Sequence, residues 1–409
     1  MAENKHTIGD LYQMQALPLG AKIRMTERRI QGWIDEYGSD GVYISFSGGK
    51  DSTVLMDIVR NRMGYKEIPA VFVDVPTQFP ELKEFALTWD NVEVLMPLIS
   101  FMQVCEQYGF PLISKEVSEI IQGSRKYMKK FRASNDGDMV KTHAKYMSSL
   151  IGIRGTSDNT TECAKKLEGL MLDQKKDLQR KINSKQGISQ ALLNLGKQYA
   201  QNNQDLSRFN NSKYSFMLDA PFEVSPACCR VMKKTPIHKY EKMTGRKPIT
   251  AQMASESRLR AQKWLRNGCN GFDMKRPISN PMSFWTEQDI LQYIKENHLQ
   301  ICSVYGEIVE DTSGTDEVTG QMTISDINGF ENMKLFDAER PPLKTTGCKR
   351  TGCMLCGFGC HMSDDTRFLQ LKESHPKMYE LLDVVKNNGI SFREAINWMN
   401  EHGDLNIRL

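Results

Sequence analysis

The sequence predicts an α/β fold built on a parallel sheet, and strand-to-helix units in the first hundred residues carry this prediction. An apolar run over 41–46 is typical of a buried strand, and apolar residues at helical spacing follow over 53–63. A second strand is expected over 68–75 and a short third strand over 91–95. Strands that alternate with helices at this spacing form parallel sheets with right-handed crossovers.

The turn between the first strand and its helix has the sequence Ser47-Gly48-Gly49-Lys50-Asp51-Ser52. Its two glycines allow the backbone to bend tightly and to approach a ligand closely. The amide groups of the turn and of the first helical turn point toward one place, where the helix dipole favours an anion. Lys50 adds a full positive charge. The turn therefore predicts a phosphate or pyrophosphate site, and the plainer alternative is a packed strand–turn–helix connection.

Composition limits the class of protein. The chain has 409 residues, ten of them cysteine, and it contains no apolar run long enough for a membrane span. Its first residues lack an apolar signal segment, so we expect a soluble, cytoplasmic protein without membrane contact. In a long cytosolic chain, cysteines more often serve metal binding or catalysis than disulfides.

Four regions are expected along the chain. Residues 1–40 form a helical lead-in, with a helix over 21–37 that Gly38 ends. Residues 41–123 and 214–300 form the α/β domain, in which Thr286 to Asp289 resembles a capping box ahead of an amphipathic helix. Residues 301–409 form a cysteine-rich segment followed by helices, and 306–342 within it are expected to be irregular or to contain a hairpin.

The region between the two parts of the α/β domain, 124–213, has a different composition. It contains 18 Lys and Arg against 8 Asp and Glu, a net charge of +10 in a chain whose total is +4. Apolar residues at helical spacing predict an inserted helical subdomain with flexible parts near 134–138 and 155–161. A basic block of this kind favours nucleic-acid binding, and a solvated helical surface is the alternative.

Further candidate ligands follow other predicted strands, because ligands of open parallel sheets bind beyond the carboxyl ends of the strands. Asp74 ends the second strand, where a turn-forming helix cap is the alternative role. A strand is expected over 248–254, and Ser257, Arg258 and Arg260 come after it. Arginines in such a place suit phosphate or sulfate.

Two groups of cysteines predict a metal centre. Ser225 suits a helix N-cap and Pro226 a first helical position, so Cys228 and Cys229 would lie in a first helical turn, where thiolates are favoured. The alternative for this pair is two buried structural thiols.

The second group comprises four cysteines within thirteen residues, namely Cys348, Cys353, Cys356 and Cys360. Its spacing and its glycines allow the thiolates to surround one metal centre. All-thiolate ligation fits either zinc or a [4Fe–4S] cluster.

Several of these motifs together resemble the phosphoadenosine phosphosulfate (PAPS) reductase family of the PP-loop, or adenine nucleotide alpha-hydrolase, superfamily. The resemblance covers roughly residues 41–123 and 214–372. It is carried by the loop Ser47–Ser52, Phe79-Pro-Glu81, the Cys-Cys-Arg segment from Cys228, Ser257-Arg258 with Arg260, the Asn-Pro and Trp-Thr-Glu-x-Asp-Ile segments over 280–290, and Cys353-x-x-Cys356.

The resemblance implies a Rossmann-like fold of the HUP type, with helices on both faces of the sheet. It implies an adenine nucleotide at the loop, either ATP or a sulfonucleotide, with Mg²⁺ as an accompanying ion and Lys50 and Asp51 as catalytic residues. In the iron–sulfur members of the family, the Cys-Cys pair and the Cys-x-x-Cys pair hold one [4Fe–4S] cluster. The resemblance thus implies Cys228, Cys229, Cys353 and Cys356 as its ligands, with Cys348 and Cys360 as alternatives.

One departure from the family pattern affects the expected reaction. Reductases of this family have a Glu-Cys-Gly-Leu-His tail whose cysteine attacks the sulfate sulfur, whereas this sequence has no cysteine after Cys360. We therefore expect an enzyme that cleaves ATP to AMP and pyrophosphate, coupled to sulfur transfer or to adenylation of an acceptor such as nucleic acid. Reduction of adenylyl sulfate or PAPS to sulfite is one alternative. A nucleotide- or DNA-binding subunit of a larger assembly, with a structural metal site, is another.

Overall fold

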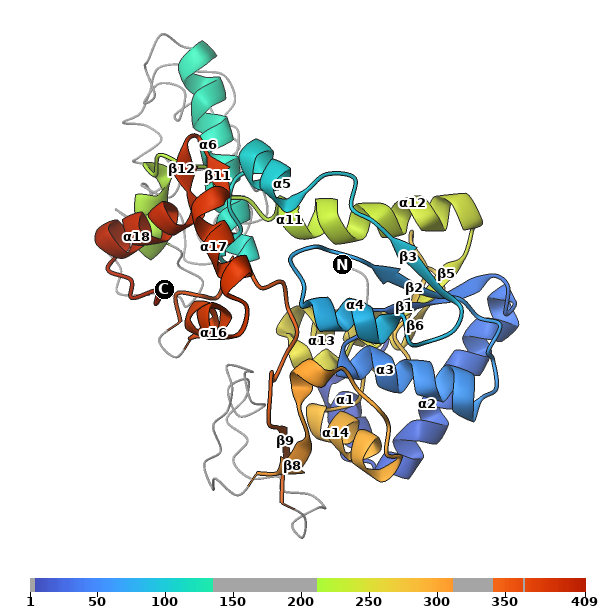
Figure 1. Ribbon diagram of the computed structural model, residues 1–409. Helices are drawn as coiled ribbons and strands as arrows, with labels where there is room; N and C mark the ends of the chain where they lie inside the picture. The colour runs from blue at the N-terminus through green and yellow to red at the C-terminus, as the bar shows by residue number, and fades with distance from the viewer. Residues whose placement is uncertain (1–3, 135–211, 312–340, 363–364) are drawn as a thin grey trace. The chain divides into compact units, whose positions relative to one another are not determined.

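The computed structural model describes residues 4–134, 212–311, 341–362 and 365–409 (Figure 1). The predicted insertion therefore lies outside the described residues, apart from its two ends. Contacts within the chain define two compact units, one of residues 1–98 and 232–353 and the other of 99–231 and 354–409. This division places 99–123 apart from the sheet and 301–353 with it, unlike the boundaries expected from the sequence.

The first unit is built on a six-stranded sheet, and its strand order is β3-β2-β1-β5-β7-β6. All neighbouring strands are parallel except β6 and β7. The strands are β1 (Val42–Phe46), β2 (Ala70–Val73), β3 (Val92–Leu95), β5 (Lys247–Ile249), β6 (Asn270–Gly271) and β7 (Ile278–Ser279). The α/β fold with a mainly parallel sheet is thus confirmed.

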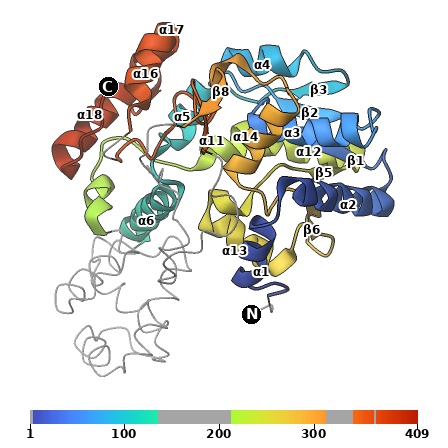
Figure 2. The ribbon, with the colours of Figure 1, turned by 90° about the horizontal axis from the view of Figure 1, so that it is seen from below.

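Helices cover both faces of this sheet (Figures 1 and 2). Ile44 and Phe72 face a large apolar core that includes α2, α3 and α14, whereas Tyr43 and Val71 face Tyr240 of α12. The alternation follows from the two-residue period of a strand. The helices of this unit are α1 (Ile8–Gln15), α2 (Leu19–Tyr37), α3 (Lys50–Asp57), α4 (Pro80–Ala86), α12 (Thr235–Thr244), α13 (Arg258–Asn267) and α14 (Glu287–Glu296).

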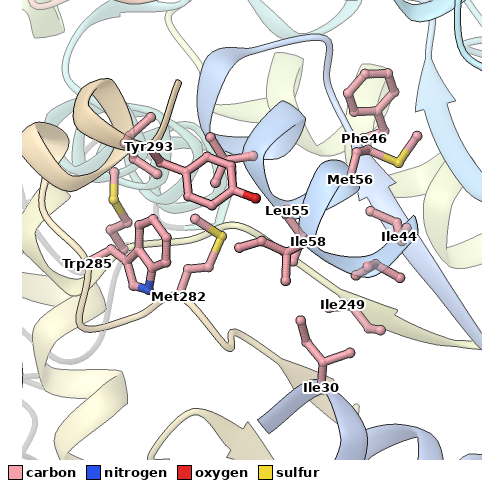
Figure 3. Close-up of a cluster of buried hydrophobic side chains, with 14 of the residues drawn as sticks. Ile30, Ile44, Phe46, Leu55, Met56, Ile58, Ile249, Met282, Trp285 and Tyr293 are labelled. Atoms are coloured by element: carbon pink, nitrogen blue, oxygen red, sulfur yellow. The ribbon is translucent and has the colours of Figure 1, made fainter. Parts of the chain in front are cut away.

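The large core binds the lead-in helix to the sheet. Figure 3 shows Ile30 of α2 beside Ile44 and Ile249 of the sheet, with Trp285 and Tyr293 completing the cluster. All five side chains are fully buried. Removing such apolar surface from water is the main favourable term in folding, so this cluster stabilises the packing of α2 against the sheet.

Several element bounds differ from those expected. The strand expected over 248–254 stops at Ile249, because Met253 and Ala254 pack into the core around the 3₁₀ helix Ala254–Glu256 instead of continuing the ladder. The helix expected over 53–63 begins at Lys50 and continues after Asp57 as the π-helix Ile58–Arg62. The capping motif Thr286 to Asp289 is confirmed at the start of α14.

A hairpin completes the first unit. Strands β8 (Ile308–Glu310) and β9 (Leu343–Thr345) are antiparallel, and the 3₁₀ helix Ser303–Tyr305 precedes β8. Gln288 of α14 anchors the hairpin, since its side chain donates to the carbonyl oxygen of Leu343 at 3.0 Å and accepts from the amide of Leu343 at 2.8 Å. A hairpin-bearing segment was expected over 306–342, of which 312–340 lie outside the described residues.

The second unit contains mainly helices, as expected for the C-terminal part. Aromatic residues Phe110, Phe222, Phe368 and Phe392 pack together in its core. Its elements are α5 (Phe101–Tyr108), β4 (Leu112–Ile113), α6 (Lys115–Ser134), the 3₁₀ helix Ser212–Leu218, α11 (Ala227–Cys229), β10 (Gly357–Phe358), α16 (Arg367–Ser374), α17 (Pro376–Val384), β11 (Lys386–Asn387), β12 (Ile390–Ser391) and α18 (Phe392–Gly403). Between the units, Arg230–Lys234 forms a π-helix. No helix in the described part of the chain is long and apolar enough to cross a membrane.

Candidate nucleotide site

The glycine loop lies at the carboxyl end of β1, and α3 starts within it at Lys50. Gly48 has a φ of +71°, and a Cβ there would lie 2.8 Å from the carbonyl oxygen of Leu82 in α4. Both the dihedral angle and the close approach therefore require glycine at this position. On one side of β1 the chain continues to β2 and β3, and on the other side lie β5 and β7. The loop thus occupies the topological switch point of the sheet, where open α/β sheets bind their ligands.

Two serines hold the loop in shape. The hydroxyl of Ser52 donates to the carbonyl oxygen of Gly49 at 2.9 Å and contacts the hydroxyl of Ser47 at 3.0 Å. The amide of Ser47 donates back to Ser52 Oγ at 3.2 Å. The first amides of α3 have no partner within the helix, and that of Lys50 donates to the hydroxyl of Tyr305 at 3.2 Å. The braced loop therefore turns the next amides toward an anion.

Lys50 is buried and contacts three groups. Its ammonium nitrogen lies 3.1 Å from Oε1 of Glu287 and donates to the carbonyl oxygen of Lys349 at 2.9 Å. The same nitrogen lies 5.4 Å from the ring centre of Tyr305, within the range of a cation–π contact. Lys50 is therefore held as a localised positive charge beside the loop.

Asp51 is the second charged residue of the loop. Its Oδ1 is buried, and it has no hydrogen-bond partner among the residues described. Burial raises the pKa of the Asp51 carboxyl, against the opposing positive charge of Lys50. A buried oxygen that lacks a hydrogen-bond partner destabilises the folded protein. Its position beside a cavity therefore indicates that a bound ligand or ion supplies the missing partner.

A cavity of about 160 Å³ opens beside the loop. Its lining carries three carboxylates, from Asp51, Glu256 and Glu287, together with the cationic groups of Lys50 and Arg350. The remaining lining residues are Ser47, Gly49, Met253, Tyr305 and Thr351. Four of the six predicted loop residues thus line the cavity, and Gly48 and Ser52 support the turn behind them.

Asp74 lies at the carboxyl end of β2 and forms an ion pair with Lys83 of α4, with 2.6 Å between Oδ2 and Nζ. It does not line the cavity. Thr77 Oγ1 and Gln78 Oε1, from the segment that follows, are buried without hydrogen-bond partners in the described part of the chain. The carboxyl end of β2 therefore also has unsatisfied polar groups, although Asp74 itself is paired.

The predicted segment after β5 contributes to the site indirectly. Ser257 is the N-cap of α13, and its hydroxyl accepts from the amide of Arg260 at 3.3 Å. Arg260 forms an ion pair with Glu256, which lines the cavity. Burial lowers the pKa of the Arg260 guanidinium, partly offset by the charge of Asp51. Arg258 is exposed at the first position of the same helix.

Sequence reasoning missed six residues that line the cavity, namely Met253, Glu256, Glu287, Tyr305, Arg350 and Thr351. Glu287 lies inside the predicted capping motif of α14, so its position was visible in the sequence but its role was not. Tyr305 and Lys50 are 255 residues apart, and no local pattern connects them.

The predicted metal ligands lie in both units. Cys228 and Cys229 are in α11 of the second unit, where the N-cap is Pro226 and not Ser225, whose hydroxyl instead accepts from the amide of Ala227 at 3.1 Å. Cys353 ends the first unit, where its backbone bridges to Gln78, and Cys356 belongs to the second unit. Within the described ranges, no three His, Cys, Asp or Glu side chains are grouped as a metal site. The metal centre therefore stays a prediction.

Cys360 offers little reactivity. It is 2% exposed, and burial raises the pKa of its thiol to about 12. The neighbouring His361 contacts the hydroxyl of Tyr214 through Nε2 at 3.0 Å. Arg367 holds the turn in front of Cys360 by donating to the carbonyl oxygens of Cys356 and Phe358, both at 2.8 Å.

Comparison with known proteins gives one relative and one family profile. A protein from Caenorhabditis briggsae named probable FAD synthase is 29% identical over 94 residues, which cover 21% of this chain and 18% of the relative. The match thus spans less than a fifth of that relative's length. The family profile described as phosphoadenosine phosphosulfate reductase domain matches residues 41–92 and 160–357, more than half of the chain. The chain therefore belongs to the phosphoadenosine phosphosulfate reductase domain family of adenine nucleotide alpha-hydrolase-like proteins.

Proposed function

We propose that the protein is an enzyme that binds ATP at the loop Ser47–Ser52 and cleaves it between the α and β phosphates. An acceptor atom attacks the α-phosphorus, the bond to the bridging oxygen breaks, and pyrophosphate leaves with the bonding electrons. The acceptor becomes an adenylate, which a sulfur donor or a second group then attacks.

The observation that carries this proposal is the buried Lys50 and the buried Oδ1 atom of Asp51 beside a cavity at the switch point of the sheet. The Lys50 ammonium and the first amides of α3 would stabilise the negative charge that develops on the phosphate oxygens, at low cost of reorganisation. Asp51 would hold an ion such as Mg²⁺ or position the acceptor. The family implies an adenine nucleotide, which agrees with this arrangement.

Two features favour ATP over a sulfonucleotide. Reduction of a sulfonucleotide requires a reactive thiolate near the sulfur. Five of the nine described cysteines are buried, namely Cys105, Cys228, Cys269, Cys302 and Cys360. Of the four half-buried ones, Cys229, Cys353 and Cys356 are ligands of the cluster proposed below, and burial raises the pKa of the Cys348 thiol. In addition, FAD contains an AMP half, so the activity named for the relative transfers an adenylyl group. The family description nevertheless makes reduction of adenylyl sulfate or PAPS the second candidate function.

We propose a [4Fe–4S] cluster on Cys228, Cys229, Cys353 and Cys356, supported by the cysteine spacing and by the family resemblance. When bound, it would supply electron transfer or bind sulfur, and no step above passes through it. Anaerobic reconstitution with iron and sulfide should give a brown protein with about four irons per chain. Cys353→Ser should lower that iron content, whereas Cys105→Ser, in a buried site outside both groups, should not. Protein that stays colourless and retains only stoichiometric zinc would refute the cluster.

The acceptor is proposed from charge alone. The basic region 124–213 carries a net charge of +10 and favours nucleic acid, although it lies almost wholly outside the described residues. An adenylating or thiolating enzyme that acts on RNA or DNA would use such a region to bind its substrate. RNA or DNA should then stimulate pyrophosphate release, and the stimulation should decline as the salt concentration rises.

The experiment that tests the function compares Lys50→Ala with the native protein. Nucleotide affinity by calorimetry should fall by about 1.5–3 kcal/mol, because a charge-assisted phosphate contact is lost. Lys66→Ala is the matched control. Lys66 is an exposed lysine that precedes β2, so it lies at the amino ends of the strands, whereas the loop lies at their carboxyl ends. Unchanged affinity in Lys50→Ala would remove the basis of the proposal.

Products then separate the two candidates. The iron-loaded protein is incubated anaerobically with ATP, adenylyl sulfate or PAPS, and the products are resolved by chromatography. AMP and pyrophosphate from ATP support adenylation. Thioredoxin-dependent sulfite from either sulfonucleotide would instead support reduction.

A further inference from the structure

Figure 1 shows the β8–β9 hairpin. The two separate segments at its open end both line the nucleotide cavity, one through Tyr305 and the other through Arg350 and Thr351. Beyond the paired strands, the amide of Thr346 donates to the carbonyl oxygen of Glu307 and the amide of Gly347 to that of Tyr305, both at 2.9 Å. A Cβ at Gly347 would lie 2.4 Å from the carbonyl oxygen of Val304, so glycine allows this approach. The backbone therefore fixes the two segments against each other where they meet the cavity.

Tyr305 and Thr351, one from each segment, form a hydroxyl pair in the cavity wall. Their oxygens are 2.7 Å apart, and Tyr305 also accepts from the amide of Lys50 at 3.2 Å. The pair has two hydroxyl hydrogens, and the bond between the residues uses one. Whichever residue donates, the second hydrogen remains for another acceptor. Burial raises the pKa of Tyr305 to about 12, so its hydroxyl stays protonated at neutral pH.

Arg350 lines the same cavity and differs from the other two cations around it. Lys50 is paired with Glu287, and Arg260 is paired with Glu256. Arg350 is exposed at the cavity, and the structure gives it no hydrogen-bond or ion-pair partner in the part of the chain that it describes. Its positive charge lowers the pKa of the Asp51 carboxyl, against the larger opposing effect of burial. An arginine fork without a partner, beside donors that already face a cavity, suits two phosphate oxygens.

We propose that Arg350, with the Tyr305–Thr351 hydroxyl pair, forms a second phosphate-binding wall, so that the site takes a nucleoside polyphosphate and not a nucleoside monophosphate. The loop with Lys50 binds one phosphate, and the hairpin binds the phosphates that AMP lacks. This inference rests on the proposed nucleotide site, and it adds residues and a ligand class that the loop motif does not specify.

The test measures binding of ATP, inorganic pyrophosphate and AMP to full-length protein by calorimetry. In Arg350→Ala, the affinities for ATP and pyrophosphate should fall roughly 10- to 100-fold, while the affinity for AMP changes less than about threefold. Arg350→Lys should restore part of the loss. Arg266→Ala is the control, because Arg266 is an exposed arginine at the far end of α13.

Two hydroxyl variants examine the other half of the wall. Tyr305→Phe and Thr351→Val each leave one hydroxyl whose hydrogen is free for the ligand, so each should weaken ATP binding less than about threefold. The double variant removes both hydroxyls and should weaken ATP binding about 3- to 10-fold. Thermal unfolding of each variant confirms that it is folded.

The outcomes separate this inference from the nucleotide site itself. Native ATP affinity in Arg350→Ala, with Lys50→Ala impaired, would overturn the second wall and leave the loop site intact. An equal loss for AMP and ATP would also overturn it, because Arg350 would then not discriminate by phosphate number. If Lys50→Ala and Arg350→Ala both bind as the native protein does, the nucleotide site fails together with the wall.

Discussion

Two buried lysines form ion pairs with the same turn of α14, and the surroundings of the two pairs differ. Lys22 of α2 places its ammonium nitrogen 2.7 Å from both carboxylate oxygens of Asp289, and the two side chains are 3% and 10% exposed. Lys50 contacts Glu287, two residues earlier, whose side chain is 20% exposed beside a cavity. The first pair is closed to water, whereas the second opens to a ligand site.

The difference separates a structural ion pair from one that a ligand can replace. Asp289 also accepts from the amide and the hydroxyl of Thr286, so its oxygens are satisfied within the protein. A phosphate that enters the cavity would compete with Glu287 for the ammonium group of Lys50. The same helical turn therefore supports the fold through one carboxylate and the site through another.

The largest expected effect is on stability at the closed pair. Lys22→Met should lower the free energy of unfolding by about 3–5 kcal/mol, because it leaves the Asp289 carboxylate buried without its counter-charge. Urea unfolding followed by circular dichroism measures this change. Asp289→Asn in the same chain should recover part of it, since the double variant buries no lone charge. A loss below about 1 kcal/mol would mean that water reaches Asp289.

The open pair should give a smaller loss of stability. Lys50→Met leaves Glu287 partly exposed at the cavity, where water can solvate the carboxylate, so we expect about 1 kcal/mol or less in the same unfolding experiment. Nucleotide affinity should fall in this variant as in Lys50→Ala, and it should be unchanged in Lys22→Met below its unfolding transition. Equal losses of stability at Lys22 and Lys50 would remove the distinction between the pairs.

The smallest expected effect concerns the pH dependence of stability at Asp51. The folded protein raises the pKa of this carboxyl through burial, so its ionisation opposes folding. This contribution to stability is complete below the unfolded pKa of about 4, and it is lost as the pH rises through the folded pKa. Asp51→Asn should therefore be more stable than the native protein at pH 7, and the advantage should disappear toward pH 3–4 in urea unfolding. A constant difference across this range would contradict the raised pKa.

The parts of the fold that the sequence predicted are local in origin. The strand before Ser47, the helix that Gly38 ends and the cap at Thr286 each depend on residues a few positions apart. The apolar run over 248–254 gave a strand that was too long, because a buried apolar residue can pack in a 3₁₀ turn as well as in a ladder. The spacing of apolar residues in the sequence does not by itself distinguish a strand from a 3₁₀ turn.

The parts of the site that could not be predicted are joined only by tertiary contacts. The carbonyl oxygen of Lys349 and the ammonium of Lys50 are 299 residues apart in the sequence, and the hairpin that brings them together is held by Gln288. Asp74 lies at the carboxyl end of β2, where the sequence predicts a ligand contact, and the structure adds an ion pair with Lys83, nine residues later.

The first turn of α14 has a consequence for how substitutions would be tolerated. Glu287, Gln288 and Asp289 are consecutive, yet they contact the loop lysine, the hairpin and the lead-in helix, respectively. A complete substitution map of this turn should therefore show three adjacent sensitive positions with unrelated causes. In a selection for folding alone, substitutions of Asp289 should be the most harmful of the three. In a selection for nucleotide binding, substitutions of Glu287 should be harmful as well. Gln288 would respond through the placement of Arg350, although its own side chain does not line the cavity.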